Sequence, residues 1–566
     1  MNWKNRYNNW MNSNYVNNEV KIKINNFTES ELRDRFCDEL TFGTGGVRGI
    51  MDYGTNRINE YTIELITQGY SDYLNSKSSE KKEVAIAYDT RNNSKYFAEI
   101  ASKVFLGNNI KVKIFEEPTP TPLLSYVITK LGLDGGIVIT ASHNPKEYNG
   151  YKIYNGFGGQ ITEDKANKIR EYIRKVTSFD YIKKISSADE KVSFIQEEVI
   201  EEYIKDVKSL IIDKEILNCA KDLRIIYSPL YGAGSKMVKR VLKECGFENV
   251  KAVLDEPDGD FPLVTYPNPE EKELYNLVWE LSKENLSDVL ILTDPDCDRV
   301  GIAVLCEDKY RYFTGNELGV LLVYYILERD CKLKEDMKKF IIKTIVTTDL
   351  VKEIAKGYKN TKVIETLTGF KYIGEKVEEL EKDKECKFIL GFEESLGYLR
   401  GNFVKDKDGV IGCISILEMI LYYKEKGKNL IDVLQEVYNK YGYYKEELVY
   451  FNFETTAGKN SIKNIMTNFR ENIHLIKGKF KVKILEDYNT GERIYYDNNN
   501  IEKINLPYSN VLKFILEDNC SFVIRPSGTE PKLKIYFSAK GGNLEDAKCK
   551  INQLKLKVVE VIKNMM

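Results

Sequence analysis

Histidine is nearly absent from this chain of 566 residues, which contains only His143 and His474. A metal site built from several histidines is therefore excluded. Ten cysteines are present, but none of them forms a C-x-x-C pair. This pattern argues against a zinc ribbon and against a disulfide scaffold, and it is typical of a protein of the reducing cytoplasm.

Long apolar runs and excess charge of one sign are also missing. The longest apolar stretch, 318–327, has about ten residues, whereas a membrane span needs about twenty, so we expect a buried helix there. Residues 1–20 are rich in asparagine and lack the apolar core of a secretory signal. The 84 Lys and Arg nearly balance the 86 Asp and Glu, and no basic stripe indicates nucleic-acid binding. We expect a cytoplasmic protein with no membrane and no nucleic-acid partner.

One pattern recurs along the chain: a short apolar run ends abruptly in a loop of small and polar residues. Such runs lie at 84–88, 136–139, 224–227, 289–292, 388–390 and 521–524. Continuous apolar runs suit strands buried on both faces, and amphipathic stretches lie between them. The alternation predicts α/β domains with largely parallel sheets, whose ligands bind beyond the carboxyl ends of the strands. Charge-rich segments near 200–215, 320–335 and 442–456 are candidate domain boundaries.

The loop at 140–145 reads T-A-S-H-N-P and follows one of these runs. Serine can carry a phosphoryl group as a covalent intermediate, and such chemistry needs cations nearby, for which His143 and Lys152 are candidates. A plain turn is the alternative. A hydrolase pair of Ser142 and His143 is disfavoured, because adjacent residues rarely meet as nucleophile and base and no G-x-S-x-G surrounds the serine.

The loop at 294–299 reads D-P-D-C-D-R and follows the run 289–292. In an extended segment, alternate residues face one side, so three carboxylates would converge on one point and favour a hard cation such as Mg²⁺. An EF-hand is excluded, because its sixth and twelfth positions would be Arg299 and Leu305. A phosphatase with an aspartyl nucleophile and a solvated acidic turn remain as alternatives.

The loop at 391–398 reads G-F-E-E-S-L-G-Y. Its carboxylates and hydroxyl can match a pattern of sugar hydroxyls, while a helix N-terminus that favours glutamate is the alternative. The nearby charged segment 405–409 has the composition of a mobile loop.

The loop at 525–531 reads R-P-S-G-T-E-P, in which Arg525 can form a fork onto phosphate and the turn can offer backbone N–H groups. It is not a Walker motif, because no lysine follows the glycine; a structural turn is the alternative. A glycine-rich segment at 41–49 carries Arg48 but fits no dinucleotide-binding pattern.

Taken together and in this order, these loops resemble those of the α-D-phosphohexomutase superfamily. The chain is similar to the phosphoglucomutase and phosphomannomutase family, and within it to the phosphoglucomutase-2-like branch. The resemblance implies an α/β protein of four domains around a central cleft: three similar mixed α/β sheets and a smaller α+β C-terminal domain. We place these domains at 1–205, 206–322, 323–445 and 446–566.

The resemblance also implies roles for the loop residues. Ser142 would be phosphorylated and would bind Mg²⁺ together with Asp294, Asp296 and Asp298. Arg48, His143, Lys152 and Lys371 would serve the transfer, with Lys152 as an acid/base candidate. The substrate would contact Glu393, Ser395 and Arg299, and its second phosphate would lie on Arg525, Ser527, Gly528 and Thr529.

The reaction implied is the interconversion of glucose 1-phosphate and glucose 6-phosphate, with glucose 1,6-bisphosphate as intermediate and activator. Pentose phosphates are the alternative substrates. Mannose phosphates are disfavoured, because the sugar loop lacks the histidine of the phosphomannomutase pattern G-E-x-S-G-H. Sugar bisphosphate synthesis, a sugar-phosphate phosphatase and a non-catalytic sugar-phosphate sensor are more remote alternatives. We expect a monomer or a homodimer.

Overall fold

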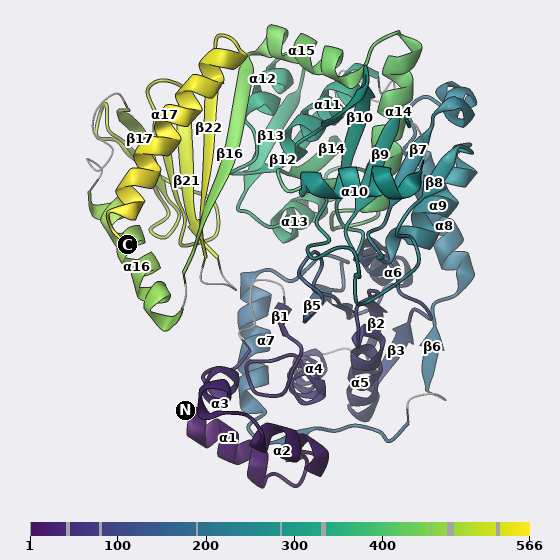
Figure 1. Ribbon diagram of the computed structural model, residues 1–566, viewed down its shortest axis with the longest axis vertical. Helices are drawn as coiled ribbons and strands as arrows, with labels where there is room; N and C mark the ends of the chain where they lie inside the picture. Colours follow the sequence, from purple (N-terminus) through teal and green to yellow (C-terminus); the bar gives the residue numbers. More distant parts are fainter. Residues whose placement is uncertain are drawn as a thin grey trace. The chain divides into compact units, whose positions relative to one another are not determined.

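The computed structural model describes nine stretches of the chain (Figure 1). They are residues 2–40, 46–77, 82–187, 191–283, 286–329, 336–453, 455–472, 480–527 and 532–566. The chain forms two compact units. One comprises residues 1–341 and 369–429, and the other comprises residues 342–368 and 430–566.

The first sheet of the first unit has six strands in the order β1-β5-β4-β2-β3-β6. The strands are β1 (Gly46–Ile50), β2 (Lys82–Tyr88), β3 (Ile110–Ile114), β4 (Gly135–Ile139), β5 (Tyr148–Asn155) and β6 (Val192–Phe194). Its helices are α4 (Glu60–Asn75), α5 (Ser94–Gly107), α6 (Thr121–Leu131), α7 (Glu163–Lys175) and α8 (Glu197–Ser209). Strand β4 is buried along its whole length, as expected for a central strand covered on both faces.

Three short helices precede this sheet: α1 (Trp3–Asn12), α2 (Asn18–Asn25) and α3 (Glu29–Phe36). An aromatic cluster fixes them to the domain, since the Trp10 ring meets Phe36 and Phe179 edge-on at 5.7 Å and Tyr61 at 5.2 Å. Asn2, Asn17 and Thr28 cap the three helices with their side chains, so polar residues of the N-terminal segment serve as helix caps.

The second sheet has the order β11-β10-β9-β7-β8. Its strands are β7 (Ile225–Ser228), β8 (Val250–Ala252), β9 (Val289–Thr293), β10 (Val300–Cys306) and β11 (Lys309–Tyr312), with helices α9 (Gly234–Glu244) and α10 (Lys272–Ser282). The third sheet has the order β13-β12-β14-β15. Its strands β14 (Cys386–Glu393) and β15 (Gly397–Leu399) lie in the first unit together with α11 (Gly315–Arg329), α13 (Phe370–Leu380) and α14 (Gly409–Glu425).

Helix α11 contains the longest apolar stretch of the sequence, and its residues 318–326 are buried. The prediction of a buried helix there is confirmed. Among the described residues, no helix has both the length and the apolar character that crossing a bilayer requires.

The three sheets are mixed, whereas the apolar runs alone predicted largely parallel sheets. Strand β2 runs parallel to β3 and β4, but β5 runs antiparallel to β4. In the same way β10 runs antiparallel to β9, and β15 to β14. Parallel neighbours require a long crossover, while a short loop can only return the chain antiparallel. The short returns lie at 140–147, 294–299 and 394–396, and they coincide with the loops that the sequence singled out at 140–145, 294–299 and 391–398.

The second unit contains β13 (Thr361–Thr366) and α12 (Leu350–Lys356), and the residues of β12 (Lys338–Thr344) are divided between the units. It also contains a seven-stranded sheet in the order β16-β22-β21-β20-β17-β18-β19. Its strands are β16 (Tyr443–Asn452), β17 (Val482–Asp487), β18 (Glu492–Tyr495), β19 (Ile501–Lys503), β20 (Leu512–Leu516), β21 (Cys520–Pro526) and β22 (Lys532–Gly541).

All neighbours in this seven-stranded sheet pair antiparallel. Its helices are α15 (Leu430–Tyr441), α16 (Thr455–Glu471) and α17 (Leu544–Lys563), of which α17 packs across β16 and β22 (Figure 1). The rings of Phe514 and Phe522 stack at 4.5 Å in its core. Three mixed sheets and a separate C-terminal sheet domain confirm the predicted fold class.

Candidate active site

Ser142 lies in the loop that connects β4 to β5, and only 1% of its surface is exposed. Its backbone φ of +54° lies in the left-handed region, which residues other than glycine seldom adopt. Its N–H donates to Thr140 Oγ1 at 2.8 Å, and its hydroxyl donates to Asp294 Oδ2 at 2.8 Å. His143 Nδ1 lies 3.1 Å from the same hydroxyl oxygen. The serine is therefore held toward the aspartate loop.

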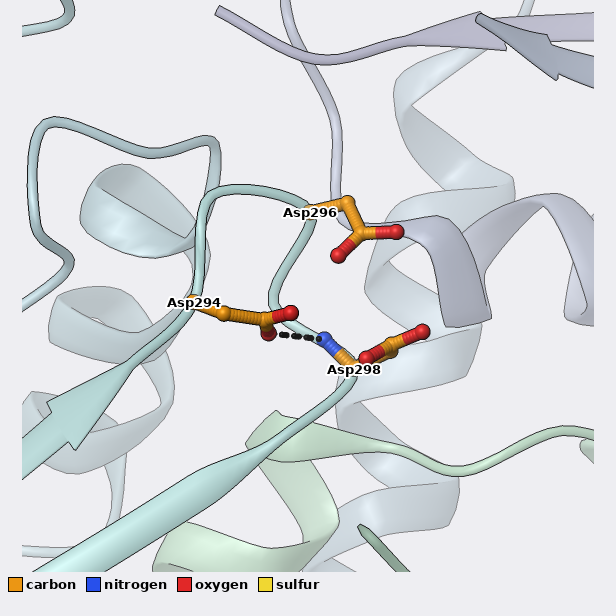
Figure 2. Close-up of side chains that lie close together, drawn as sticks. All are labelled: Asp294, Asp296 and Asp298. Atoms are coloured by element: carbon orange, nitrogen blue, oxygen red, sulfur yellow. Dashed lines mark hydrogen bonds between the residues drawn. The ribbon is translucent and has the colours of Figure 1, made fainter. Parts of the chain in front are cut away.

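Asp294, Asp296 and Asp298 are buried, and each offers a carboxylate oxygen that lies within 4.8 Å of those of the other two. Figure 2 shows the three side chains on one tight loop, with Asp294 pointing across the loop toward Asp298. The sequence predicted this convergence, but from an extended segment, and that reason is wrong. The chain turns, because Cys297 N–H donates to the Asp294 carbonyl at 2.8 Å and Cys297 has a φ of +52°.

The loop is stiffened from within as well. Asp294 Oδ1 accepts from the backbone N–H of Asp298 at 3.1 Å, the bond drawn in Figure 2, and from that of Arg299 at 3.0 Å. From the first domain, Thr121 at the start of α6 donates its N–H to the Asp296 carbonyl at 2.9 Å and its hydroxyl to Asp296 Oδ2 at 3.1 Å. Residues of two domains therefore fix the position of Asp296.

Two lysines lie against the acidic loop. Lys152 Nζ, from β5, is 2.7 Å from Asp296 Oδ2 and 3.4 Å from Asp298 Oδ2. Lys407 Nζ is 2.8 Å from Asp298 Oδ2. Burial opposes the charge of Lys407, but the carboxylates of Asp298 and Asp406 hold its pKa above the ordinary value. Lys407 was missed by reasoning from the sequence.

Residues 405–408 are buried, so the expectation of a mobile charged loop is wrong. Tyr154 and Gln160 donate to Asp406 Oδ2 at 2.5 and 2.7 Å, and Tyr203 donates to Asp408 Oδ2 at 2.8 Å. One feature of the sequence could have indicated that residues 405–408 are buried: the largely apolar run that begins at residue 410. A helix that is buried all round carries its N-terminal residues into the interior.

The electrostatics of the three aspartates favour a bound cation. Burial raises the pKa of Asp294 well above its usual range, and the carboxylates of Asp298 and Asp296 raise it further. Burial acts in the same direction on Asp296, but the Lys152 ammonium outweighs it, and the pKa of Asp296 lies below its ordinary value. Asp296 Oδ1 and Asp298 Oδ1 are buried without a hydrogen-bond partner among the described residues. Buried carboxylate oxygens that accept no hydrogen bond fit a hard divalent cation.

Glu393 ends β14 and is buried, and its Oε1 accepts from the N–H of Gly369 at 2.8 Å. Ser395 lies in the loop that follows and is half-buried. The segment is a hairpin between β14 and β15, which excludes the alternative of a helix N-terminus. The Leu396 carbonyl accepts from the N–H of Val300 at 3.0 Å, so the sugar loop and the aspartate loop are joined.

The remaining predicted residues of the first unit lie around these loops. Arg48 Nη1, on β1, donates to Asn144 Oδ1 at 3.3 Å, which places the arginine beside the serine loop. Arg299 Nη1 is 2.9 Å from Glu270 Oε1. Lys371 lies in the first turn of α13, and its Nζ donates to Glu163 Oε1 at 2.6 Å.

The predicted phosphate loop begins in the second unit. Arg525 lies near the end of β21, and the N–H of Ser527 donates to the Lys532 carbonyl at 2.8 Å. Gly528 and Thr529 lie outside the described residues, as does the glycine-rich segment 41–45.

Comparison with known families gives four consecutive matches. They are the alpha/beta/alpha domains I, II and III of phosphoglucomutase/phosphomannomutase at residues 39–180, 201–307 and 314–441, and the C-terminal domain of the same family at 478–548. The chain belongs to the phosphoglucomutase/phosphomannomutase family of the α-D-phosphohexomutase superfamily, and it is a phosphohexomutase enzyme.

Relatives named phosphoglucomutase are similar over nearly the whole chain. The protein of Staphylococcus aureus is 36% identical over 532 residues, which cover 93% of this chain and 94% of the relative. That of Staphylococcus saprophyticus is 36% identical and covers 92% and 94%.

Among solved structures, parafusin, a phosphoglucomutase from Paramecium, superimposes with a TM-score of 0.70 at 18% identity and covers 93% of this chain and 96% of its own. A phosphoglucomutase/phosphomannomutase family protein of Burkholderia thailandensis gives a TM-score of 0.65 at 16% identity, with coverage of 93% and 97%. At these identities the structures support the fold alone.

Proposed function

We propose that the chain interconverts glucose 1-phosphate and glucose 6-phosphate, with Ser142 as the residue that carries the phosphoryl group. The observation behind this proposal is the 2.8 Å hydrogen bond from the Ser142 hydroxyl to Asp294 Oδ2 within a buried cluster of three aspartates. The glucose assignment rests on relatives named phosphoglucomutase at 36% identity.

In the first half of the reaction, the P–O bond to phosphorylated Ser142 breaks and a new P–O bond forms to the free hydroxyl of the sugar phosphate. Glucose 1,6-bisphosphate results, turns around, and returns its other phosphoryl group to Ser142. Lys152 is the acid/base candidate, since its ammonium lies 2.7 Å from Asp296 beside the serine loop. His143 belongs to this loop and Arg48 contacts it, and positive charge there favours a transferring phosphoryl group.

The aspartates would hold Mg²⁺ together with the phosphoserine. Bound there, the ion would offset the charge on the transferring phosphoryl oxygens. A solved N-acetylphosphoglucosamine mutase of Aspergillus fumigatus contains GlcNAc-6P and magnesium. Asp296 Oδ1 and Asp298 Oδ1, which accept no hydrogen bond within the described part of the chain, support a cation site.

The sugar hydroxyls would contact Glu393 and Ser395, and Arg299 would also bind the substrate. Lys371, in the first turn of α13, would serve the transfer. The phosphate that is not transferred would be held by Arg525, Ser527, Gly528 and Thr529. Binding at this distant phosphate would orient the hydroxyl that reacts. The proposal also includes four domains that end at residues 205, 322, 445 and 566. We further propose that the protein is cytoplasmic and is a monomer or a homodimer.

A coupled dehydrogenase assay tests the reaction. Glucose 1-phosphate, Mg²⁺ and a trace of glucose 1,6-bisphosphate should yield glucose 6-phosphate, and a parallel reaction with ribose 1-phosphate should be much slower. Preferential conversion of the pentose would keep the mechanism and change the substrate. Release of free phosphate without any isomer would overturn the mutase assignment in favour of a phosphatase.

The metal site has its own test. Asp296→Ala should abolish both Mg²⁺ binding and transfer, because it removes one of the three carboxylates around the site. Asp222→Ala, at an exposed position, is the matched control and should behave as the wild type. Normal turnover by the Asp296→Ala protein would disprove the metal assignment.

A further inference from the structure

Arg91 follows β2 in the D-T-R segment 89–91 and is buried, with 3% of its surface exposed. Its guanidinium donates to four backbone carbonyls in and directly after the serine loop. Nη1 donates to Pro145 O at 2.8 Å and to Tyr148 O at 3.1 Å. Nη2 donates to Ser142 O at 2.5 Å and to Asn144 O. One side chain therefore binds three carbonyls of the loop between β4 and β5 and the carbonyl of Tyr148, the first residue of β5.

The guanidinium is itself held from two other sides. Asp89 Oδ2 lies 3.3 Å from Arg91 Nε, and both side chains are fully buried. Ser94 donates to the other oxygen of Asp89 at 2.6 Å and fixes that carboxylate. The ring of Phe261 lies 5.0 Å from the guanidinium carbon and belongs to the core of the second sheet domain. Arg91 therefore contacts both the first domain, which supplies Ser142, and the second domain, which supplies the aspartates.

The conformation of the serine loop explains why a clamp, meaning the four bonds from Arg91 to these carbonyls, is needed. Ser142 has a left-handed φ of +54°, which a non-glycine residue keeps only when its surroundings enforce it. Four carbonyl oxygens that point to one buried position repel each other unless a donor lies between them. A planar guanidinium offers paired donors on two nitrogens, whereas a lysine ammonium is a single point with three donors.

We propose that Arg91 is the positioning residue of the phosphoryl-carrying loop. It fixes the backbone at Ser142, so that the hydroxyl stays within hydrogen-bond distance of Asp294. This inference deepens the proposed function and rests on the assignment of Ser142 as the residue that carries the phosphoryl group.

The test is Arg91→Lys, which keeps the positive charge beside Asp89 but cannot reach both pairs of carbonyls. We expect kcat to fall about 100-fold, the order of loss that small misplacements of a reacting group produce. KM for glucose 1-phosphate should change less than threefold, because the clamp touches no predicted sugar ligand. The rate of phosphoryl transfer from labelled glucose 1,6-bisphosphate to the enzyme should fall in parallel with kcat.

Arg57→Lys is the matched control. Arg57 is also a buried arginine of the first domain, but its described bonds go to Asn56 O and to Asp34. A general effect of replacing a buried arginine would lower the unfolding temperature of both variants, whereas only Arg91→Lys should lose kcat at constant KM.

Phe261→Leu is a second variant in case Arg91→Lys does not fold. It keeps Arg91 but removes the ring that holds the guanidinium in place. The four carbonyl bonds should therefore loosen, and kcat should fall at least threefold at constant KM. If Arg91→Lys is folded and keeps kcat within threefold of the wild type, or if it fails to fold and Phe261→Leu keeps the wild-type kcat, the inference is overturned. A wild-type protein that transfers no phosphoryl group to Ser142 would instead overturn the proposed function.

Discussion

The Ser142 hydroxyl donates a 2.8 Å hydrogen bond to Asp294 Oδ2 across 152 residues of sequence. The bond joins two hairpin loops, one at the end of β4 and the other at the end of β9. Because the serine oxygen lies at the edge of the acidic cluster, a phosphoryl group on it would lie among the same carboxylates that favour a cation.

Replacement of this serine gives the first prediction. Ser142→Ala should lose about 10⁴-fold or more of mutase activity, the scale seen when a covalent nucleophile is removed. The loss should persist with glucose 1,6-bisphosphate in excess, which excludes a deficit of activator. Ser76→Ala, at an exposed helix end, should keep wild-type activity. Retained turnover in Ser142→Ala would show that another residue carries the phosphoryl group.

Thr121 supplies the second prediction, since both its N–H and its hydroxyl bind Asp296. Thr121→Val removes the hydroxyl at nearly constant volume and should weaken Mg²⁺ binding about tenfold, as is usual for groups that orient a metal ligand. Thr121→Ser should bind Mg²⁺ almost as the wild type does. Isothermal titration calorimetry measures the affinity directly, without the enzyme assay.

Thr129→Val, in the same helix α6, is the control, because the Thr129 hydroxyl donates to carbonyls of Ser125 and Phe157. Equal Mg²⁺ affinities for Thr121→Val and Thr129→Val would show that the hydroxyl bond to Asp296 does not matter for the metal.

The third prediction concerns Gly369, whose N–H donates to Glu393 and whose φ is +123°. Alanine is strained at this φ and should displace the N–H from the carboxylate. A hydrogen bond to a charged group is worth about 1.5–3 kcal/mol. We therefore expect Gly369→Ala to raise KM for glucose 1-phosphate about tenfold or more, measured in the coupled assay.

Gly427→Ala is a matched control for backbone strain, since Gly427 has a φ of +69° and a β-carbon added there would have no heavy atom within 4 Å. It should lower the unfolding temperature without a change in KM. An unchanged KM in Gly369→Ala would show that the position of the Glu393 carboxylate does not matter for sugar binding.

The fourth prediction is a pH dependence of stability at Asp408. Burial raises the pKa of Asp408 from 3.8 to about 7. Protonation at this site therefore stabilises the folded protein below pH 4, and that stabilisation is lost as the pH rises through 7. For a carboxyl with these two pKa values the full effect is on the order of 4 kcal/mol.

Asp408→Asn keeps acceptors for the N–H groups of Val410 and Ile411 but cannot ionise. Relative to the wild type, its unfolding temperature should increase as the pH rises from 4 to 8. Asp222→Asn, at an exposed site, should show a constant difference over the same range. Parallel curves for Asp408→Asn and the wild type would contradict the raised pKa.

Local patterns in the sequence were sufficient to predict the loops that meet in the first unit. An apolar run that stops at a cluster of polar residues marks the end of a buried strand, and the serine, aspartate and sugar loops all lie at such ends. The carboxylates were predicted to converge, although the cause proved to be a turn at Cys297 rather than an extended segment.

Residues whose role depends on distant partners could not be found in this way. Lys407 is one of four alternating charges at 405–408, and nothing in those letters distinguishes it from a solvated lysine. Its contact with Asp298 exists because the following helix α14 is buried. Arg91 appeared in the sequence only as the last residue of a short polar loop, without any sign of the carbonyls that it gathers.

The sequence by itself determined the family, the strand-and-loop pattern and the chemical types of the predicted site residues, because these follow from short stretches of hydrophobicity and side-chain chemistry. The tertiary structure decided which of those side chains meet, which charges are buried, and which backbone conformation Ser142 adopts. Hydrogen bonds such as those of Arg91, Thr121 and Ser142 join residues from separate strand ends. Their energies depend on distance and burial, which the order of residues along the chain does not specify.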